Sequence, residues 1–154
     1  MKELYTGKDI FTMPCTPACA VCITTNGVIK KDGNAVMGAG IAKQARDKWP
    51  AVEEILGRYL KSYGNRPFVL GKVNPYGTPY HLLSLPTKHN WKECSDITLI
   101  YQSCELLMEM ADKWHFETIY LPPPGCGKGN LNYEVTVRPW VSNILDDRFV
   151  CVLR

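Results

Sequence analysis

The chain has 154 residues, of which 45% are hydrophobic and 21% charged, and its formal net charge is +3. This composition is typical of a globular domain that is long enough to bury a core, and it argues against intrinsic disorder. The positive excess would help to attract an anionic ligand but is too small to indicate a nucleic-acid-binding protein. The length fits one domain over residues 1–154. No apolar run reaches the roughly 18–20 residues of a membrane span, and the N-terminus soon becomes polar, so we expect neither membrane association nor a signal peptide.

Strand-like and helix-like segments alternate through the first half of the chain. A short apolar run before Gly27 is typical of a buried strand, whereas helical periodicity follows Gly40 and continues between Pro50 and Gly64. Two further apolar runs, separated by a turn sequence of Asn, Pro, Tyr and Gly, are typical of strands. The elements predicted here are a strand at 18–25, helices at 41–49 and 52–63, and strands at 67–73 and 80–85.

The second half continues the alternation. Its longest predicted helix begins near Ser95 and Asp96, which are both favourable N-cap residues, and carries an apolar face. A strand at 118–121 and a final strand at 149–153 enclose a shorter helix. This helix is predicted to have Thr136 as its N-cap, which places Pro139 in the first turn, where its missing N–H costs no hydrogen bond. Such alternation predicts a largely parallel sheet covered on both faces, with ligands bound beyond the carboxyl ends of strands.

The seven cysteines, at positions 15, 19, 22, 94, 104, 126 and 151, are odd in number and scattered. A disulfide framework would favour an even count in a shorter, secreted chain. Cys15, Cys19 and Cys22 are close enough for a zinc site, but no second pair of cysteines or spaced histidines follows them. We therefore expect no metal, buried free thiols and a reducing, cytoplasmic environment.

Two glycine-rich loops each follow a predicted buried strand. In the first, 34–42, Gly38 and Gly40 let the backbone approach a ligand closely, and the helix that follows offers free N–H groups at its N-terminus. The second, 124–131, has three glycines within five residues, which serve poorly as packing but well as a cradle of amides. The first loop alone could be a strand-to-helix turn that binds nothing, but the two loops together at one sheet edge could hold a diphosphate from both sides. Cys126 lacks an obvious His or carboxylate partner and is interpreted as a small loop residue.

Several segments of the chain have the order and spacing of macro domains, and the chain resembles that family over nearly its whole length. These segments are Asn26, 36–42, 85–91 and 125–131. Within the family, the chain looks most like the bacterial antitoxins that remove ADP-ribose from thymidine in DNA. A vertebrate enzyme that removes terminal ADP-ribose from proteins belongs to the same branch. The resemblance implies a three-layer α/β/α macro domain with a mixed, mostly parallel sheet, which binds ADP-ribose as a monomer and without a cofactor.

The resemblance also implies which residues contact ADP-ribose. Asp9 and Ile10 match a segment that contacts adenine, although Asp9 could equally be a turn or cap residue. Asn26 matches an asparagine that faces the distal ribose, unless the apparent insertion 28–33 gives that place to Asn34. The full set of implied ligand-binding residues is Asp9, Ile10, Asn26, Asn34, Met37, Gly38, Ala39, Gly40, Ile41, Gly125, Cys126, Gly127, Lys128, Gly129, Asn130 and Leu131.

Lys88 matches the lysine that this branch uses for catalysis, in a Pro-Thr-Lys segment just after a predicted strand. A lysine attacks the anomeric carbon of ADP-ribose only as the free amine, so a base must take its proton or the surroundings must favour the neutral form. Nearby phosphates would instead favour the ammonium. Without the resemblance, an exposed lysine that attracts the diphosphate is the better interpretation. His89 could pass a proton, although a lone loop histidine is more often solvated.

Two positions depart from other macro domains. Ala42 stands where better-known macro hydrolases have an acidic residue, so their substrate-assisted water mechanism is not expected. Gly129 stands where the protein-directed vertebrate member has an aspartate. We expect a hydrolase that removes ADP-ribose from DNA, protein or a small molecule through Lys88; an ADP-ribose reader and a phosphatase for ADP-ribose 1″-phosphate are the alternatives. We further expect a β-branched residue in place of Gly40 to weaken ADP-ribose binding without unfolding the domain.

Overall fold

A six-stranded sheet forms the centre of the computed structural model, which describes residues 1–16 and 18–154. The strands are β1 (Lys2–Tyr5), β2 (Cys19–Thr25), β3 (Val69–Val73), β4 (Tyr80–Pro86), β5 (Thr118–Leu121) and β6 (Phe149–Leu153), and their order in the sheet is β1-β6-β5-β2-β4-β3. β3 pairs with β4 in the antiparallel direction, whereas the other neighbouring strands are parallel. The predicted mixed, mostly parallel sheet is thus confirmed.

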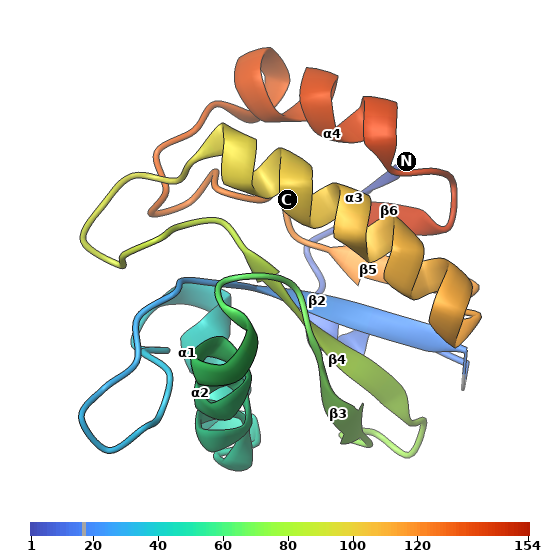
Figure 1. Ribbon diagram of the computed structural model, residues 1–154. Coiled ribbons are helices and arrows are strands. Elements are labelled where there is room, and N and C mark those ends of the chain that lie inside the picture. The colour runs from blue at the N-terminus through green and yellow to red at the C-terminus, as the bar shows by residue number, and fades with distance from the viewer. Residues whose placement is uncertain (17) are drawn as a thin grey trace.

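Helices cover both faces of this sheet, as Figure 1 shows. The helices are α1 (Gly40–Lys48), α2 (Ala51–Tyr63), α3 (Ile97–Trp114) and α4 (Arg138–Ile144), with a 3-10 turn η1 (Ile10–Thr12) and a π turn η2 (Tyr133–Val137). Side chains alternate along the central strand β2, because successive strand residues point to opposite faces. Val21 and Ile23 belong to the core beneath α1 and α2, while Ala20 and Cys22 belong to the core beneath α3 and α4. The predicted three-layer α/β/α fold is therefore confirmed.

The sequence did not predict strand β1 and misplaced the start of the last helix. Lys2–Tyr5 is mostly exposed at the sheet edge, so it has no apolar run to reveal it. Thr136 is not the N-cap of the last helix. Helical structure begins earlier, because Asn132 Oδ1 accepts a hydrogen bond from Val135 N at 2.9 Å, and Thr136 lies inside the resulting π turn. Pro139 does lie in the first turn of α4, as predicted.

The expectation of free, buried thiols is wrong for four of the seven cysteines, among which Cys126 is free but only half-buried. Cys15 and Cys19 form a disulfide bond, with their Cα atoms 5.3 Å apart, which is within the range that a disulfide requires. Cys94 is a free thiol but is exposed. The spacing of Cys15 and Cys19 in the sequence gave no indication that these two residues pair.

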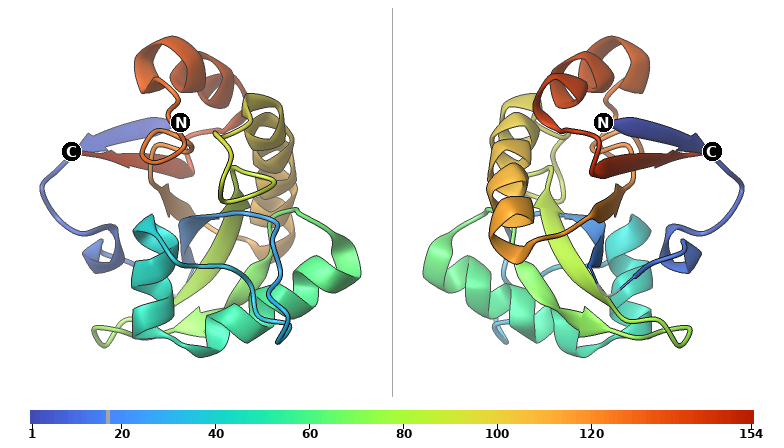
Figure 2. Two further views of the ribbon diagram at one scale, coloured as in Figure 1. Left: turned by 90° about the vertical axis from the view of Figure 1, so that its left-hand side faces the viewer. Right: turned by 90° about the vertical axis from the view of Figure 1, so that its right-hand side faces the viewer.

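The loops that matter most leave one edge of the sheet. β2, β4 and β5 are parallel, and β2 lies between the other two, so their carboxyl ends reach the same edge. Figure 2 (left) looks onto this edge, where the loops after these three strands lie in front of the sheet. This is the place where α/β sheets bind ligands.

In the described part of the chain, no helix has both the length and the apolar character that crossing a membrane requires.

Candidate functional site

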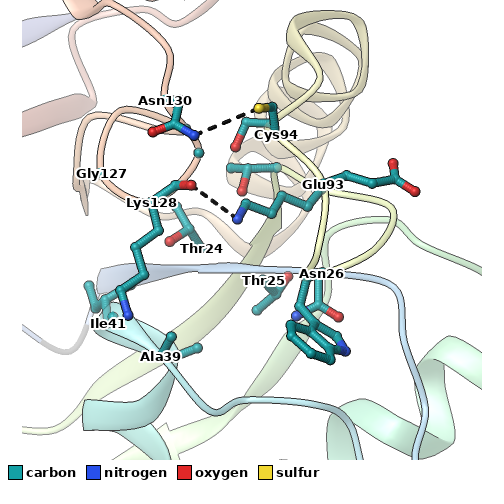
Figure 3. Close-up of a pocket in the computed structure, with 18 of the residues that line it drawn as sticks. Thr24, Thr25, Asn26, Ala39, Ile41, Glu93, Cys94, Gly127, Lys128 and Asn130 are labelled. Atoms are coloured by element: carbon teal, nitrogen blue, oxygen red, sulfur yellow. Dashed lines mark hydrogen bonds between the residues drawn. The ribbon is translucent and has the colours of Figure 1, made fainter.

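A cavity of about 800 Å³ opens at this sheet edge, a volume within the ~300–1,000 Å³ range of small-molecule sites. Both glycine-rich loops line it: the first with residues 36–42, and the second with Gly125 and residues 127–130. A third wall comes from the segment after β4, including residues 91–95 (Figure 3). The structure thus brings the two loops to one cavity, as the sequence predicts.

The first loop presents to the cavity backbone donors that have no hydrogen-bond partner among the described residues. Ala39 is the N-cap of α1, and its side chain makes no capping hydrogen bond. The N–H groups of Gly40, Ile41 and Ala42 form the first turn, where no intrahelical acceptor exists. Most helices satisfy such donors with Ser, Thr, Asp or Asn at the N-cap. With alanine there, the donors and the positive end of the helix dipole remain available to an anion, for which phosphate is the fitting partner.

The two glycines of this loop differ in what they tolerate. Gly40 has φ +59°, a left-handed conformation that strains any β-branched residue. Gly40→Val would therefore cost stability as well as space, so it does not separate a loss of binding from a loss of folding. At Gly38 the backbone is not left-handed, and an added Cβ would meet nothing within 4 Å. Gly38 is the cleaner position for probing close approach of a ligand.

We predict that Gly38→Ala lowers ADP-ribose affinity roughly tenfold, which corresponds to about 1.4 kcal/mol, while thermal stability is unchanged. The added methyl group would stand in the open space next to the backbone that lines the cavity. Calorimetric titration with ADP-ribose measures the effect. Gly7→Ala is the matched control, because its Cβ also meets nothing within 4 Å and Gly7 lies outside the cavity wall. Equal affinities for the two variants would contradict the prediction.

The second loop supplies a further set of donors. Its turn is held by hydrogen bonds from Leu131 N to Gly125 O at 2.9 Å and from Asn130 N to Gly127 O at 3.2 Å. The N–H groups of Gly127, Lys128 and Gly129 make no hydrogen bond within the described part of the chain. Figure 3 shows the Lys128 side chain extending across the cavity toward Ile41. Amides and an ammonium group from the second loop thus face the amides of the first.

Packing explains two of the three glycines in this loop. A Cβ on Gly129 would clash with Ser95 Oγ and with the carbonyl oxygen of Gly125. A Cβ on Gly125 would lie 2.9 Å from side-chain atoms of Ile100, Leu131 and Ser95. The expectation that these glycines serve poorly as packing is therefore wrong for Gly125 and Gly129, which let the loop press onto the start of α3. Gly127 has open space around it.

Lys88 lies half-buried in the third wall of the cavity. Its Nζ donates a hydrogen bond to the carbonyl oxygen of Lys128 at 3.3 Å, which joins the third wall to the second loop. The backbone on either side of Lys88 is fixed. Thr87 N bonds to Thr25 O at 3.0 Å in continuation of the β2–β4 pairing, and Asn65 Nδ2 bonds to Lys88 O at 2.9 Å. The lysine is therefore positioned by rigid neighbours rather than by a loose loop.

His89 lies outside the cavity wall. Its Nε2 is 2.9 Å from Asp96 Oδ2, and both side chains are substantially exposed. Asp96 is the N-cap of α3 and also accepts a hydrogen bond from Thr98 N. The hydrogen bond from His89 and those from the helix N–H groups lower the pKa of Asp96 below its ordinary value. This pairing directs His89 to the helix cap and gives no support to a proton transfer between His89 and Lys88.

Several implied ligand contacts are not part of the cavity wall. Asp9 Oδ1 accepts a hydrogen bond from Phe11 N at 2.9 Å and caps the turn η1, and Ile10 is buried in the core. Asn26 lines the cavity whereas Asn34 does not, which favours Asn26 over Asn34 as the asparagine that faces the distal ribose. The Asn26 side chain is engaged locally, because its Nδ2 donates to Val36 O at 3.1 Å and its Oδ1 accepts from Val28 N at 3.0 Å.

Cys126 and Leu131 also stand outside the cavity wall. Leu131 packs against the core beneath α3, and the Cys126 thiol is 3.4 Å from Pro124 O. Burial raises the pKa of Cys126 to about 11. Because the thiolate is the nucleophilic form, this thiol is poorly suited to covalent catalysis at neutral pH. No group of three or more His, Cys, Asp or Glu side chains that could hold a metal ion occurs within residues 1–16 and 18–154.

The sequence interpretation gave no ligand-binding or catalytic role to about half of the cavity wall. The residues without such a role include three threonines at strand ends, the segment after Lys88 and two prolines after β5. They are Thr24, Thr25, Val36, Ala42, Thr87, Trp91, Lys92, Glu93, Cys94, Ser95, Pro122 and Pro123. The available signal was topological: once 85 and 121 are recognised as ends of parallel strands, the residues that follow are expected at the ligand edge.

Comparisons with known proteins agree with this geometry, although no family model matches the chain. The DNA ADP-ribosyl glycohydrolase of Mycobacterium tuberculosis is 29% identical over 104 residues, which cover 64% of this chain and 29% of that protein. The DNA ADP-ribosyl glycohydrolase of Thermus aquaticus is 26% identical over 101 residues, which cover 62% of this chain and 27% of that protein. The match thus spans less than a third of the length of either relative.

Solved structures extend the likeness to the whole fold. The macrodomain of Mycobacterium tuberculosis DarG has a TM-score of 0.78 and 25% sequence identity, covering 98% of this chain and 96% of that chain. Thermosipho africanus DarTG, solved in complex with ADP-ribose, has a TM-score of 0.80 at 21% identity, covering 99% of this chain and 42% of that chain. The sheet order, the paired amide loops and these likenesses show that the chain has the macro-domain fold and is similar to the macrodomains of DarG proteins.

Proposed function

We propose that the chain binds ADP-ribose in the 800 Å³ cavity and hydrolyses the bond that joins it to a base in DNA. The observation that carries this proposal is the place of Lys88, whose Nζ lies in the cavity 3.3 Å from Lys128 O, beside two loops of unpaired amides. The amides suit a diphosphate, and the lysine suits reaction at the distal ribose. The DNA-directed activity named for the curated relatives supports the choice of leaving group.

Lys88 would act as the nucleophile. As the neutral amine it attacks C1″ of the ADP-ribosyl group, and a C–N bond forms while the bond from C1″ to the base breaks. The base leaves with the proton that the amine loses. Water then attacks the same carbon, which releases ADP-ribose and restores the free lysine. Among the cavity-lining residues that the structure describes, Glu93 is the one carboxylate, and Figure 3 shows it pointing away from Lys128. We therefore assign the proton to the leaving base.

A reader that binds ADP-ribose without turnover is the second candidate. It is favoured by the hydrogen bond from Lys88 Nζ to Lys128 O, since a lysine engaged with a carbonyl can serve simply to hold the two walls of the cavity together. In that case the amide loops would supply all of the binding, and Lys88 would add charge rather than chemistry. Turnover distinguishes the two functions.

The test is a comparison of three substrates under identical conditions: ADP-ribosylated DNA, ADP-ribosylated protein and ADP-ribose 1″-phosphate. We expect release of free ADP-ribose from the DNA at a rate well above that from the protein, and no release of phosphate. Chromatography of the products measures all three reactions. Binding of ADP-ribose without turnover of any substrate would identify a reader, and rapid release from protein alone would replace DNA as the substrate.

A further inference from the structure

Trp91 stands at the rim of the cavity, apart from the other tryptophans. It lines the cavity three residues after Lys88, yet it is 51% exposed. The other three tryptophans each pair with an aromatic ring: Trp49 with Phe11, Trp114 with Phe116 and Trp140 with Tyr101. Trp91 has no such ring partner among the described residues. Its indole is thus a large flat surface that the fold itself does not use for aromatic packing.

One basic side chain lies over this ring, and two others line the same cavity. Lys92 Nζ lies 5.2 Å from the centroid of the Trp91 ring, in the geometry of a cation–π contact. The cavity wall also contains Lys88 and Lys128, against the single carboxylate of Glu93 in the described wall. Proteins that bind single-stranded nucleic acids combine these two features, since bases stack on aromatic side chains while basic groups follow the backbone.

The position of Trp91 also fits the direction in which a leaving group departs. ADP-ribose held by the two amide loops must place C1″ within reach of Lys88 Nζ, which is tied to Lys128 O. Trp91 continues the wall that carries Lys88 and is open to solvent, so a group attached to C1″ would pass it on the way out. A base that carries an ADP-ribosyl group into this cavity must leave the base stack, as do other bases on which enzymes act.

We infer that Trp91 and Lys92 form a subsite for the leaving group, in which an unpaired nucleobase of the modified strand stacks on the indole. Lys92 then pairs with a neighbouring phosphate of the strand. This inference rests on the proposed function and adds to it the substrate form, namely a single-stranded or locally unpaired nucleic acid.

The inference is tested by binding, in the Lys88→Ala background so that the ligand stays intact. We expect Trp91→Ala to weaken binding of an ADP-ribosylated single-stranded oligonucleotide roughly five- to hundredfold, as ~1–3 kcal/mol of base stacking predicts at about 1.4 kcal/mol per tenfold. Affinity for free ADP-ribose should change by less than about twofold, and Trp91→Phe should retain most of the oligonucleotide affinity. Trp140→Ala is the matched control, since Trp140 is also 51% exposed but lies outside the cavity wall.

Two results would overturn the inference. If Trp91→Ala weakens binding of the oligonucleotide and of free ADP-ribose equally, Trp91 belongs to the ADP-ribose site itself. If Trp91→Ala binds the oligonucleotide as tightly as its Lys88→Ala parent does, no base stacks on Trp91. Both results are binding measurements, so they do not depend on whether the protein hydrolyses its ligand. Absence of turnover by the unmodified protein would refute the hydrolase, while a Trp91-dependent preference for the oligonucleotide would still support the subsite.

Discussion

Replacing Lys88 with alanine is expected to lower turnover of the ADP-ribosylated substrate ~10³-fold or more, because removal of a nucleophile abolishes the route through a covalent intermediate. Affinity for ADP-ribose should change only by a small factor. The amide donors of both loops remain in place, and the hydrogen bond that is lost, from Nζ to Lys128 O, is internal to the protein. A group used in the transition state affects turnover rather than ground-state binding. Single-turnover kinetics and calorimetry measure the two quantities separately.

Lys88→Arg is the stricter variant. It keeps the positive charge and can still donate to Lys128 O, but a guanidinium is not deprotonated in proteins and cannot attack C1″. We therefore expect Lys88→Arg to be nearly as inactive as Lys88→Ala. If arginine restores turnover and alanine mainly lowers affinity, Lys88 acts through its charge, and bound water becomes the nucleophile to test.

Hydrophobic periodicity was sufficient to predict most of the fold. The strands β2 to β6 and the helices α1 to α3 carry continuous apolar runs or one apolar face, because each is covered by a neighbouring layer. β1 escaped prediction since it is an exposed edge strand that gains its place from pairing with β6 at the far end of the chain. Such long-range pairing leaves no local pattern in the sequence.

The site was predictable to the extent that it depends on backbone. Both glycine loops were found because close approach and unpaired amides have a sequence signature. Side-chain contacts were harder to predict. Asp9 was expected to contact adenine, but its carboxylate caps η1, and Asp9 lies outside the cavity wall. Lys88 was predicted in the third wall, but Trp91 was given no role there, since an exposed aromatic residue has no periodic pattern. It becomes noticeable only when the fold brings it beside Lys88.

Gly129→Ala is expected to destabilise the domain by ~1–3 kcal/mol, the usual cost of forcing extra atoms into a well-packed site. The new Cβ would clash with Ser95 Oγ and with Gly125 O, and Ser95 N already bonds to Gly129 O at 3.0 Å, so the loop cannot move away freely. In a domain of 150–250 residues each kcal/mol lowers the melting temperature by about 2–4 °C. Gly127→Ala is the matched control in the same loop, since a Cβ at this position meets nothing within 4 Å. We expect this variant to have the melting temperature of the parent protein.

An aspartate, which the resemblance places at this position in the protein-directed vertebrate enzyme, would need still more room, so we expect Gly129→Asp to lower stability further. It should not create activity on ADP-ribosylated protein, because Ser95 occupies the space that the added side chain requires.

The contact between Gly129 and Ser95 predicts an energetic coupling between the two positions. Ser95→Gly removes the Ser95 atoms that clash, so Gly129→Ala should cost less stability in that background. The carbonyl of Gly125 remains, which limits the recovery. A double-mutant cycle measured by chemical denaturation gives the coupling free energy. Additive effects of the two substitutions would show that the loop relaxes away from α3 by another route.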